Sequence, residues 1–372
     1  MALNKYKLGE LIEEITRNND QCLYGVSQVR GLSNNKNIIE TKASVDADVI
    51  YKFLVIYPEE FVYNPRTTRM GEKVGLIINF TGKPLLFSFN NIGFAVKRKD
   101  LLLPLYLYIY FCRNEFDRHA RINSWGSATE LFTFEEMCDI DIELPPIEVQ
   151  QKYVDIYQGM VKNQQAYERG LEDLKLVCDG YIEDLRRKMP SEPIGKYIKR
   201  YSEKNSNKRI DEVVGLSTKK EFREAQSRVN RDELAGYKVL HPLDIAFVPT
   251  TDTWKVLAFA VNHFNRDVVV SPIYEVFAVD QNIILSDYLA MWLKRDEFDR
   301  YARYNSWGSA RENFSFEEMC EVRIPIPDIE IQRSISNIYE VYNMRKEINE
   351  KLKSQIKAIC PILIKGSLNE VR

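Results

Sequence analysis

The sequence predicts an α+β protein made of two similar globular units that are separated by two long helices. Three observations lead to this prediction. The chain has 372 residues, which is too long for one ordinary domain. A phrase that begins at Phe116, "FDRHARINSWGSATELFTFEEMCDI", returns at Phe298 as "FDRYARYNSWGSARENFSFEEMCEV". Each copy is followed by a stretch of about 40 residues with helical periodicity.

The repeat is a duplication of a domain-sized unit. Residues 115–157 align without a gap with residues 297–339, an offset of 182 (297 − 115), and 26 of these 43 positions are identical. This offset is far longer than the period of a solenoid repeat. The rest of each unit is similar only in outline: "IYPEEFVYNP" from Ile56 resembles "LHPLDIAFVP" from Leu240, and the residues between such points diverge. This pattern is typical of a constant scaffold that carries two different recognition surfaces.

The constant part can be interpreted locally. Thr133-Phe-Glu-Glu136 and Ser315-Phe-Glu-Glu318 have the form of capping boxes, which predicts a short helix in each unit. The segments "CDIDIELP" and "CEVRIPIP" then alternate between apolar and polar residues, which predicts a half-buried strand that closes each unit.

Two long helices follow the two copies, and apolar residues recur along each at steps of three and four. The predicted segments are 1–145 for the first globular unit, 146–190 for the first long helix, 191–327 for the second unit and 328–372 for the second helix. The predicted seam, which Gln164 interrupts, consists of Tyr153, Tyr157, Met160, Tyr167, Leu171, Leu174, Tyr181 and Leu185 in the first helix and of Ile335, Ile338, Tyr342, Ile348, Leu352, Ile356 and Ile359 in the second. Pro361 predicts that the second helix kinks or ends early.

The simplest arrangement pairs the two helices with each other as an antiparallel coiled coil. Helices of about 40 residues are roughly 60 Å long, and antiparallel pairing puts one globular unit at each end. The end of the second helix can then meet the N-terminal segment "LGELIEEI", which gives a nearly circular order of parts with a pseudo-twofold axis. Two-fold proteins use such geometry to read DNA half-sites at a fixed spacing, although a rod with two heads could also join two proteins.

Several classes of protein are excluded or disfavoured by composition. The net charge is −2, so any DNA binding must come from local basic patches. The six cysteines form no CxxC pair and the three histidines do not cluster at ligand spacing, so we expect reduced thiols and no metal site. No secretory pattern opens the chain, and the most apolar run, from Leu101, is too short to span a membrane. We expect a soluble cytoplasmic protein.

The sequence contains no motif of a self-sufficient enzyme. It has no GxGxxG after a strand and no GxxxxGK[ST] loop. Asn64-Pro65-Arg66 lacks the second proline and the aromatic residue of an amino-methyltransferase motif, so we interpret it as a turn. Catalysis has to come from a partner.

The repeated phrase, the strand exit and the long helix together resemble the specificity subunits of type I restriction–modification enzymes, over essentially the whole chain. The residues that carry this resemblance are Gly126-Ser127, Leu144-Pro145 and Gln150, with counterparts at Gly308-Ser309, Ile326-Pro327 and Gln332. Members of that family usually have Glu directly before this Gln. Here Val149 and Ile331 stand at that place, and Glu148 and Glu330 lie one position earlier.

The resemblance implies two target-recognition domains, each of which reads a few base pairs of a split, asymmetric double-stranded DNA target. It implies that the two helices set the spacing and dock two methyltransferase subunits, which use S-adenosylmethionine to methylate adenine N6. Two restriction subunits that use ATP and Mg could join them. No cofactor is expected in this chain, and no membrane is expected as a partner.

Candidate DNA contacts lie in the variable parts, as clusters of basic and hydroxyl residues at matching places in the two units. The candidates are Arg30, Lys36, Arg66, Thr68, Arg69 and Lys73 in the first unit and Ser217, Lys219, Lys220, Arg223, Thr250, Thr251, Thr253 and Lys255 in the second. The constant loops Asn123 to Ser127 and Asn305 to Ser309 are expected to be tight turns whose Trp packs against the unit. The alternatives for these loops are a contact with phosphate or with the methyltransferase.

Two other functional hypotheses stay open from the sequence. One is a two-headed coiled-coil scaffold that joins two proteins and binds no DNA, which a failure to bind any duplex would favour. The other is a self-sufficient enzyme, which the missing cofactor motifs disfavour.

Overall fold

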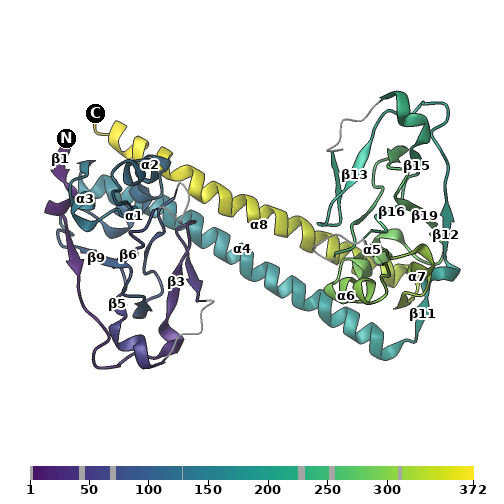
Figure 1. Cartoon of the computed structure of the whole chain (residues 1–372), viewed down its shortest axis with the longest axis horizontal. Coiled ribbons are helices and arrows are strands. Elements are labelled where there is room, and N and C mark those ends of the chain that lie inside the picture. The colour runs from purple at the N-terminus through teal and green to yellow at the C-terminus, as the bar shows by residue number, and fades with distance from the viewer. Residues whose placement is uncertain are drawn as a thin grey trace. The chain divides into compact units, whose positions relative to one another are not determined.

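The computed structural model describes residues 3–41, 47–67, 73–127, 129–224, 231–250, 256–308 and 312–372. The chain divides into two compact units: unit 1 contains residues 1–167 and 348–372, and unit 2 contains residues 168–347. Two long helices, α4 (Ile147–Lys188) and α8 (Ile329–Asn369), contribute one half of their length to each unit (Figure 1). The predicted α+β class, with two similar globular parts and two long helices, is confirmed.

Unit 1 is built on a four-stranded antiparallel sheet with the strand order β2-β9-β6-β7, beside three two-stranded pairs: β1 with β10, β3 with β4, and β5 with β8. The strands are β1 (Asn4–Lys7), β2 (Ile12–Ile15), β3 (Arg30–Leu32), β4 (Ile38–Glu40), β5 (Leu54–Ile56), β6 (Phe61–Tyr63), β7 (Leu76–Ile78), β8 (Leu85–Phe87), β9 (Ile92–Val96) and β10 (Asp141–Leu144). The helices are α1 (Pro104–Phe111), α2 (Asn114–Ile122) and α3 (Phe134–Cys138), with 3-10 turns at Leu8–Glu10, Val26–Gln28 and Ala47–Lys52.

Unit 2 repeats this topology strand for strand, with the sheet order β12-β19-β16-β17 and the pairs β11 with β20, β13 with β14, and β15 with β18. The strands are β11 (Ser191–Pro193), β12 (Ile198–Tyr201), β13 (Val214–Leu216), β14 (Phe222–Glu224), β15 (Lys238–Leu240), β16 (Ile245–Phe247), β17 (Phe259–Val261), β18 (Val268–Val270), β19 (Glu275–Val279) and β20 (Arg323–Pro325). The helices are α5 (Ser286–Leu293), α6 (Asp296–Tyr304) and α7 (Phe316–Cys320), with 3-10 turns at Ile194–Lys196 and Arg231–Gly236.

The short helices begin and end where local chemistry predicts. Thr133 accepts a hydrogen bond from the Glu136 amide at 3.2 Å, and Ser315 accepts one from the Glu318 amide at 3.1 Å, so both predicted N-caps are present. Pro104 stands in the first turn of α1, where a missing amide proton does no harm. Figure 1 shows that, within each unit, the short helices gather beside the long helices.

A single buried glutamine joins each long helix to its globular part. Gln150, in the first turn of α4, is fully buried; its side-chain oxygen accepts a hydrogen bond from the Leu103 amide at 3.0 Å, and its side-chain nitrogen donates to the carbonyl oxygens of Leu101 and Pro145 at 2.8 and 2.9 Å. Unit 2 repeats this clamp with Gln332, whose side-chain oxygen accepts from the Leu285 amide and whose side-chain nitrogen donates to the carbonyls of Ile283 and Pro327. Each glutamine therefore satisfies three backbone groups at the point where a short and a long helix start.

The two long helices run antiparallel, as predicted. In unit 1, Lys152 near the start of α4 pairs with Glu370 near the end of α8 at 2.8 Å. In unit 2, Ile182 near the end of α4 shares a core with Ile335 near the start of α8. The polar interruption of the seam is matched across the pair, because the buried Gln164 donates a hydrogen bond to the buried Asn349 at 3.0 Å. A buried polar pair of this kind fixes the register of a coiled coil.

Two positions of the predicted seam are wrong by one residue. Tyr181 and Ile348 are 49% and 43% exposed, and their neighbours Ile182 and Asn349 are buried instead. The physical reason is that each long helix packs against a globular core as well as against its partner helix, which rotates the buried stripe away from a strict coiled-coil seam. The other predicted seam residues are buried or half-buried.

The expected early end of the second helix is also wrong, since α8 continues through Pro361 to Asn369. Tertiary packing offsets the cost of the proline: Leu363 and Ile364 are buried in the core of unit 1, and the hydroxyl groups of Ser367 and Tyr106 lie 2.7 Å apart. The predicted circular order holds within this unit, where both ends of the chain lie near β1 (Figure 1). Glu143 on β10 pairs with Lys5 near the N-terminus and with Arg372 at the C-terminus.

One histidine of unit 2 lies between two carboxylates that are distant in sequence. The Nδ1 atom of His241 is 2.9 Å from Asp267 and its Nε2 atom is 3.0 Å from Glu203, while its ring stacks on Tyr201, which donates a hydrogen bond to Asp244. Partial burial acts to lower the pKa of His241, but the hydrogen bonds to Asp267 and Glu203 outweigh it and raise this pKa above its usual value.

We predict that Gln150→Met lowers the free energy of unfolding by about 3 kcal/mol, because a side chain of similar volume leaves three buried backbone groups without partners. Urea unfolding of the full chain measures this. The matched control is Gln151→Met, which changes an exposed neighbour that bonds only to Asp155. Equal stability of the two variants contradicts the clamp.

We predict that His241 stabilises unit 2 at low pH. Its pKa in the folded chain is raised, so its contribution is complete below the unfolded pKa of about 6.5 and is lost as the pH rises through the folded pKa. The measurement is the Tm of the wild-type chain minus that of His241→Gln from pH 5 to 9. This difference should fall with increasing pH, and a constant difference is the contrary result.

Candidate nucleic-acid interface

The first group of candidate DNA contacts lies on a hairpin that has the same place in both units. In unit 1 it is β3 with β4, and in unit 2 it is β13 with β14. The tips are built alike: Ser33 and Ser217 each donate a hydroxyl hydrogen bond to the carbonyl four residues later. Lys36 and Lys220 each take a left-handed backbone conformation, with φ of 58° and 62°. A common frame therefore presents different residues.

The assignment of Lys36 and Lys220 to DNA contact is wrong, because both side chains are buried inside their own units. Lys36 donates to Asp117 at 2.5 Å and to the Val74 carbonyl at 3.0 Å. Lys220 donates to Asp299, the counterpart of Asp117 in the repeat, at 2.8 Å. A buried ammonium group needs such a partner. These lysines anchor each variable hairpin to a constant helix, α2 or α6.

The remaining hairpin candidates are partly engaged in local contacts. Arg30 donates to the carbonyls of Ser27 and Val29 at 2.7 and 2.8 Å, and Arg223 donates to the Leu216 carbonyl at 2.8 Å. Ser217 at the hairpin tip is half-buried, while Lys219, two positions later, is exposed. Of this group, Lys219 is thus the residue whose ammonium is most accessible.

A second group lies on the loop after β6 and its counterpart after β16. Arg66 is exposed, and its backbone forms an isolated antiparallel β-bridge with Leu131. Thr250 forms the matching β-bridge with Asn313, and its hydroxyl donates a hydrogen bond to the Asn313 side-chain oxygen at 2.9 Å. Lys73 is exposed at the other end of the loop in unit 1. Thr68, Arg69, Thr251, Thr253 and Lys255 lie outside the described residues.

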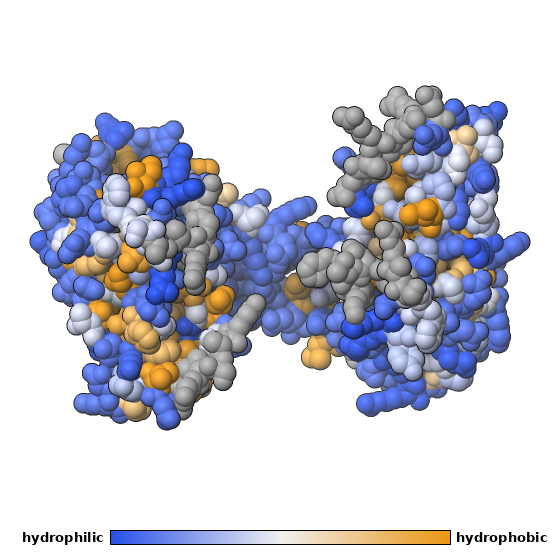
Figure 2. Space-filling view, viewed as in Figure 1, coloured by the Kyte–Doolittle hydropathy of each residue, from blue (hydrophilic) through white to orange (hydrophobic). Residues whose placement is uncertain are grey.

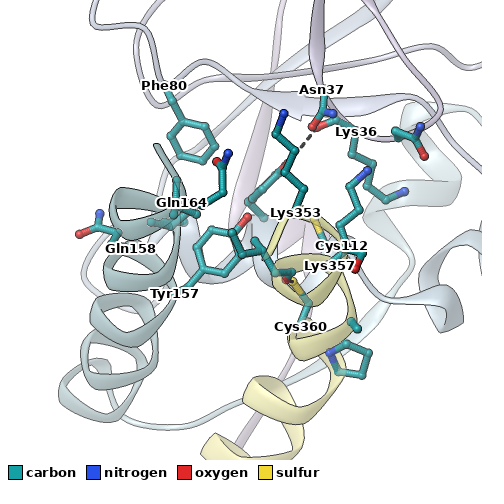
Figure 3. Close-up of a pocket in the computed structure, with 18 of the residues that line it drawn as sticks. Lys36, Asn37, Phe80, Cys112, Tyr157, Gln158, Gln164, Lys353, Lys357 and Cys360 are labelled. Carbon is teal, nitrogen blue, oxygen red and sulfur yellow. Dashed lines mark hydrogen bonds between the residues drawn. The ribbon is translucent and has the colours of Figure 1, made fainter. Parts of the chain in front are cut away.

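Unit 1 contains a cleft of about 1090 Å³ between the tip of the β3–β4 hairpin, α1 and the two long helices. Figure 3 shows that Lys353 and Lys357 project from α8, and Tyr157 and Gln164 from α4, into the same space as Lys36. The cleft therefore brings together the hairpin, the end of the second loop at Lys73, and side chains of both long helices.

The cleft is positively charged. Five lysines and two carboxylates line it, which leaves a formal charge of +3 (5 − 2). Both carboxylates are engaged, since Asp117 pairs with Lys36 and Glu350 lies 3.6 Å from Lys353. Partial burial, together with the charges of Lys73 and Lys36, lowers the pKa of Lys357. Such a shortage of negative charge favours an anionic ligand.

Three of these cationic residues were not among the candidates from the sequence: Lys162, Lys353 and Lys357. They lie on the long helices, where isolated lysines are usually solvated. No local signal in the sequence distinguishes them, because they share a cleft with Lys73 only once the loop after β6 has folded beside α4 and α8.

The expectation that Trp125 and Trp307 pack against their units is wrong. Their side chains are 67% and 69% exposed. Each tryptophan makes two backbone hydrogen bonds, to Leu131 in unit 1 and to Asn313 in unit 2, at 3.0 and 3.1 Å in both units. These loops are therefore tight turns, as expected, but they present the indole ring to solvent.

The described residues offer no metal site and no membrane span. Among them, no group of three or more His, Cys, Asp or Glu side chains is placed to hold a metal ion. None of their helices has the length and hydrophobicity to cross a bilayer.

Known proteins resemble this chain in sequence and in fold. The family model described as "Type I restriction modification DNA specificity domain" matches residues 14–173 and 254–358. The crystal structure of the S subunit of a type I restriction–modification system from M. genitalium has a similar fold, with a TM-score of 0.62 at 12% identity over 99% of this chain and 96% of that one. The HsdS subunit from Thermoanaerobacter tengcongensis has a TM-score of 0.41 at 12% identity, over 100% and 97% of the two chains. Among curated protein sequences, none matches this chain significantly.

We predict that Lys73→Ala and Lys357→Ala each weaken binding to duplex DNA of random sequence and reduce the slope of log Kobs against log salt by about 0.9, because each removes one phosphate contact. Titrations of the full chain at several salt concentrations measure the slope. Lys5→Ala is the control, since Lys5 lies on β1 and does not line the cleft. Unchanged slopes in both cleft variants contradict a phosphate-binding cleft.

Proposed function

The chain belongs to the family of type I restriction–modification DNA specificity domains, and on that premise we propose that it is the specificity subunit of such an enzyme. Each unit reads one half of a split DNA target. The two half-sites differ in sequence, because the two readers differ. The chain itself performs no chemistry.

The observation that carries this proposal is the contrast between a repeated frame and divergent loops. The two units have the same strand order, the same glutamine clamp and the same lysine anchor under the hairpin. The exposed chemistry on that frame differs: Arg66 in unit 1 stands where unit 2 has Thr250. A guanidinium and a hydroxyl group contact different base edges.

In this proposal the DNA contacts divide into two kinds. Lysines of the cleft, such as Lys73 and Lys357, bind phosphates and position the duplex without reading sequence. Residues on the loop after β6 or β16 and on the hairpin tips, such as Arg66 and Lys219, contact base edges. Phosphate contacts set the affinity and its dependence on salt, whereas base contacts set the target.

Partners supply the catalysis. Two methyltransferase subunits bind this chain, carry S-adenosylmethionine and methylate adenine N6 in the target. Restriction subunits that use ATP and Mg can join the complex. The outer faces of α4 and α8 support docking, because they leave Leu176 and Ile362 73% and 67% exposed. A partner that covers these side chains removes apolar area from water, which favours the complex.

We predict that this chain, expressed with its neighbouring methyltransferase, produces adenine methylation at one split asymmetric motif. Single-molecule sequencing of genomic DNA from cells with and without the chain measures this. Exchange of residues 191–298 for those of a homologous subunit should change one half-site and leave the other half-site and the gap unchanged.

The control is the same methyltransferase expressed alone, which should leave the motif unmethylated. If methylation is independent of the chain, or if the exchange alters both half-sites, one reader per unit is refuted. A chain that binds the methyltransferase but no duplex points instead to a protein scaffold without DNA specificity.

A further inference from the structure

Each unit holds an exposed tryptophan in a loop whose two preceding side chains are hydrogen-bonded to the helix before it. In unit 1, Ser124 donates its hydroxyl to the Ala120 carbonyl at 2.5 Å, and Asn123 donates to the His119 carbonyl at 2.9 Å. Unit 2 makes the same two bonds, from Ser306 to the Ala302 carbonyl at 2.6 Å and from Asn305 to the Tyr301 carbonyl at 3.0 Å.

Glycine completes this loop in both units. Gly126 and Gly308 have φ of 143° and 146°, a conformation that other residues rarely adopt. A Cβ atom at Gly126 would lie 2.1 Å from the Thr129 carbonyl oxygen, so no other residue fits there. The side chains of Asn123 and Ser124, and of Asn305 and Ser306, thus serve to shape the loop, whereas the indole does not.

Exposed residues precede the tryptophan on the helix before the loop, which ends at Ile122 in unit 1 and at Tyr304 in unit 2. Unit 1 has Arg118 and Ile122, four positions apart on α2, followed by Trp125 in the loop; unit 2 has Arg300 and Tyr304 on α6, followed by Trp307. Ile122 is 73% exposed and Tyr304 is 81% exposed. We call these residues the Trp stripe of each unit. Figure 2 shows that the visible surface is mostly hydrophilic, with separate hydrophobic patches, and exposed apolar side chains that lie together can mark an interaction site.

A structural role does not account for the Trp stripe. Side chains that are two-thirds or more exposed in both units add little to either core. The stripe also belongs to the segment that the duplication left nearly unchanged, whereas the hairpins and the loops after β6 and β16 diverged. Both units thus share this surface, although their neighbouring loops differ. A shared surface of this kind is expected to bind the same ligand in each unit, and that ligand does not vary with the DNA sequence.

The ligand of the Trp stripe could be the DNA backbone or a protein, and the formal charge of the surrounding segment distinguishes the two. Residues 114–131 contain two arginines and three acidic residues, a formal charge of −1 (2 − 3). Residues 296–313 contain three arginines and four acidic residues, again −1 (3 − 4). A phosphate-binding surface needs a surplus of positive charge, as the cleft in unit 1 has. An Arg with exposed aromatic and aliphatic neighbours in a balanced field is instead typical of protein–protein hot spots.

We propose that the Trp stripe of each unit is a docking surface for the methyltransferase subunit, with one copy of that subunit on each unit. The inference rests on the proposed function and adds the residues that hold the partner. The position suits this partner. The backbone of Leu131 forms β-bridges both with Trp125 and with Arg66 of the divergent loop. In unit 2, Asn313 forms the matching β-bridges with Trp307 and Thr250. A subunit docked on the stripe therefore stands next to the half-site that the loop reads.

The test is the stoichiometry and affinity of the complex between the full chain and its methyltransferase subunit, by native mass spectrometry and titration. The wild-type chain binds two subunits. Trp125→Ala and Trp307→Ala each weaken one of the two sites by about thirtyfold or more, the loss expected for a hot-spot residue, and the double variant weakens both. Random-sequence duplex binding by the chain alone stays unchanged in all three variants.

The matched controls are Leu23→Ala in unit 1 and Ile273→Ala in unit 2, which remove side chains of similar exposure, 71% and 69%, outside the stripe. Both should bind two subunits with wild-type affinity. Two-subunit binding at wild-type affinity by the double Trp variant overturns the docking surface, as does a loss confined to DNA affinity. A wild-type chain that binds neither the methyltransferase nor DNA refutes the proposed function itself.

Discussion

The organisation of this protein depends on one buried side chain in each unit, the glutamine at the start of the long helix. Gln150 and Gln332 each bond to three backbone groups that come from the start of a short helix and from the exit of the closing strand. Because both glutamines are fully buried and backbone polar groups need hydrogen-bond partners, these bonds determine locally the direction in which each long helix starts. Every function that needs the helix and the reader in a defined relation depends on this clamp.

The same logic explains how variable hairpins sit on a constant frame. Lys36 and Lys220 are embedded in segments that differ between the units, yet each reaches a carboxylate on the repeated helix, Asp117 or Asp299. A buried ion pair tolerates little displacement, because separation leaves a charge in an apolar environment. The hairpin tip is thus held by one buried lysine side chain, while its exposed residues are free to change. This arrangement separates stability from specificity.

Charge separates two surfaces with different roles. The cleft of unit 1 gathers lysines from the hairpin side and from both long helices around two engaged carboxylates, which suits a phosphate chain. The Trp stripes lie in balanced fields and offer aromatic and aliphatic area, which suits a protein. A net charge of −2 for the whole chain hides this division, since positive and negative regions cancel in the sum.

The sequence by itself determined the duplication, the two long helices and the N-caps at Thr133 and Ser315, because repeats, helical periodicity and capping can be recognised from the order of residues along the chain. It could not show that Lys36 is buried or that Trp125 is exposed. It also could not show that Ile182 replaces Tyr181 in the seam, or that α8 continues past Pro361. Only the tertiary structure decided these points. Burial and charge pairing depend on residues such as Asp117 and Asn349, which are far away in the chain, and the free energy of those contacts exceeds local preference.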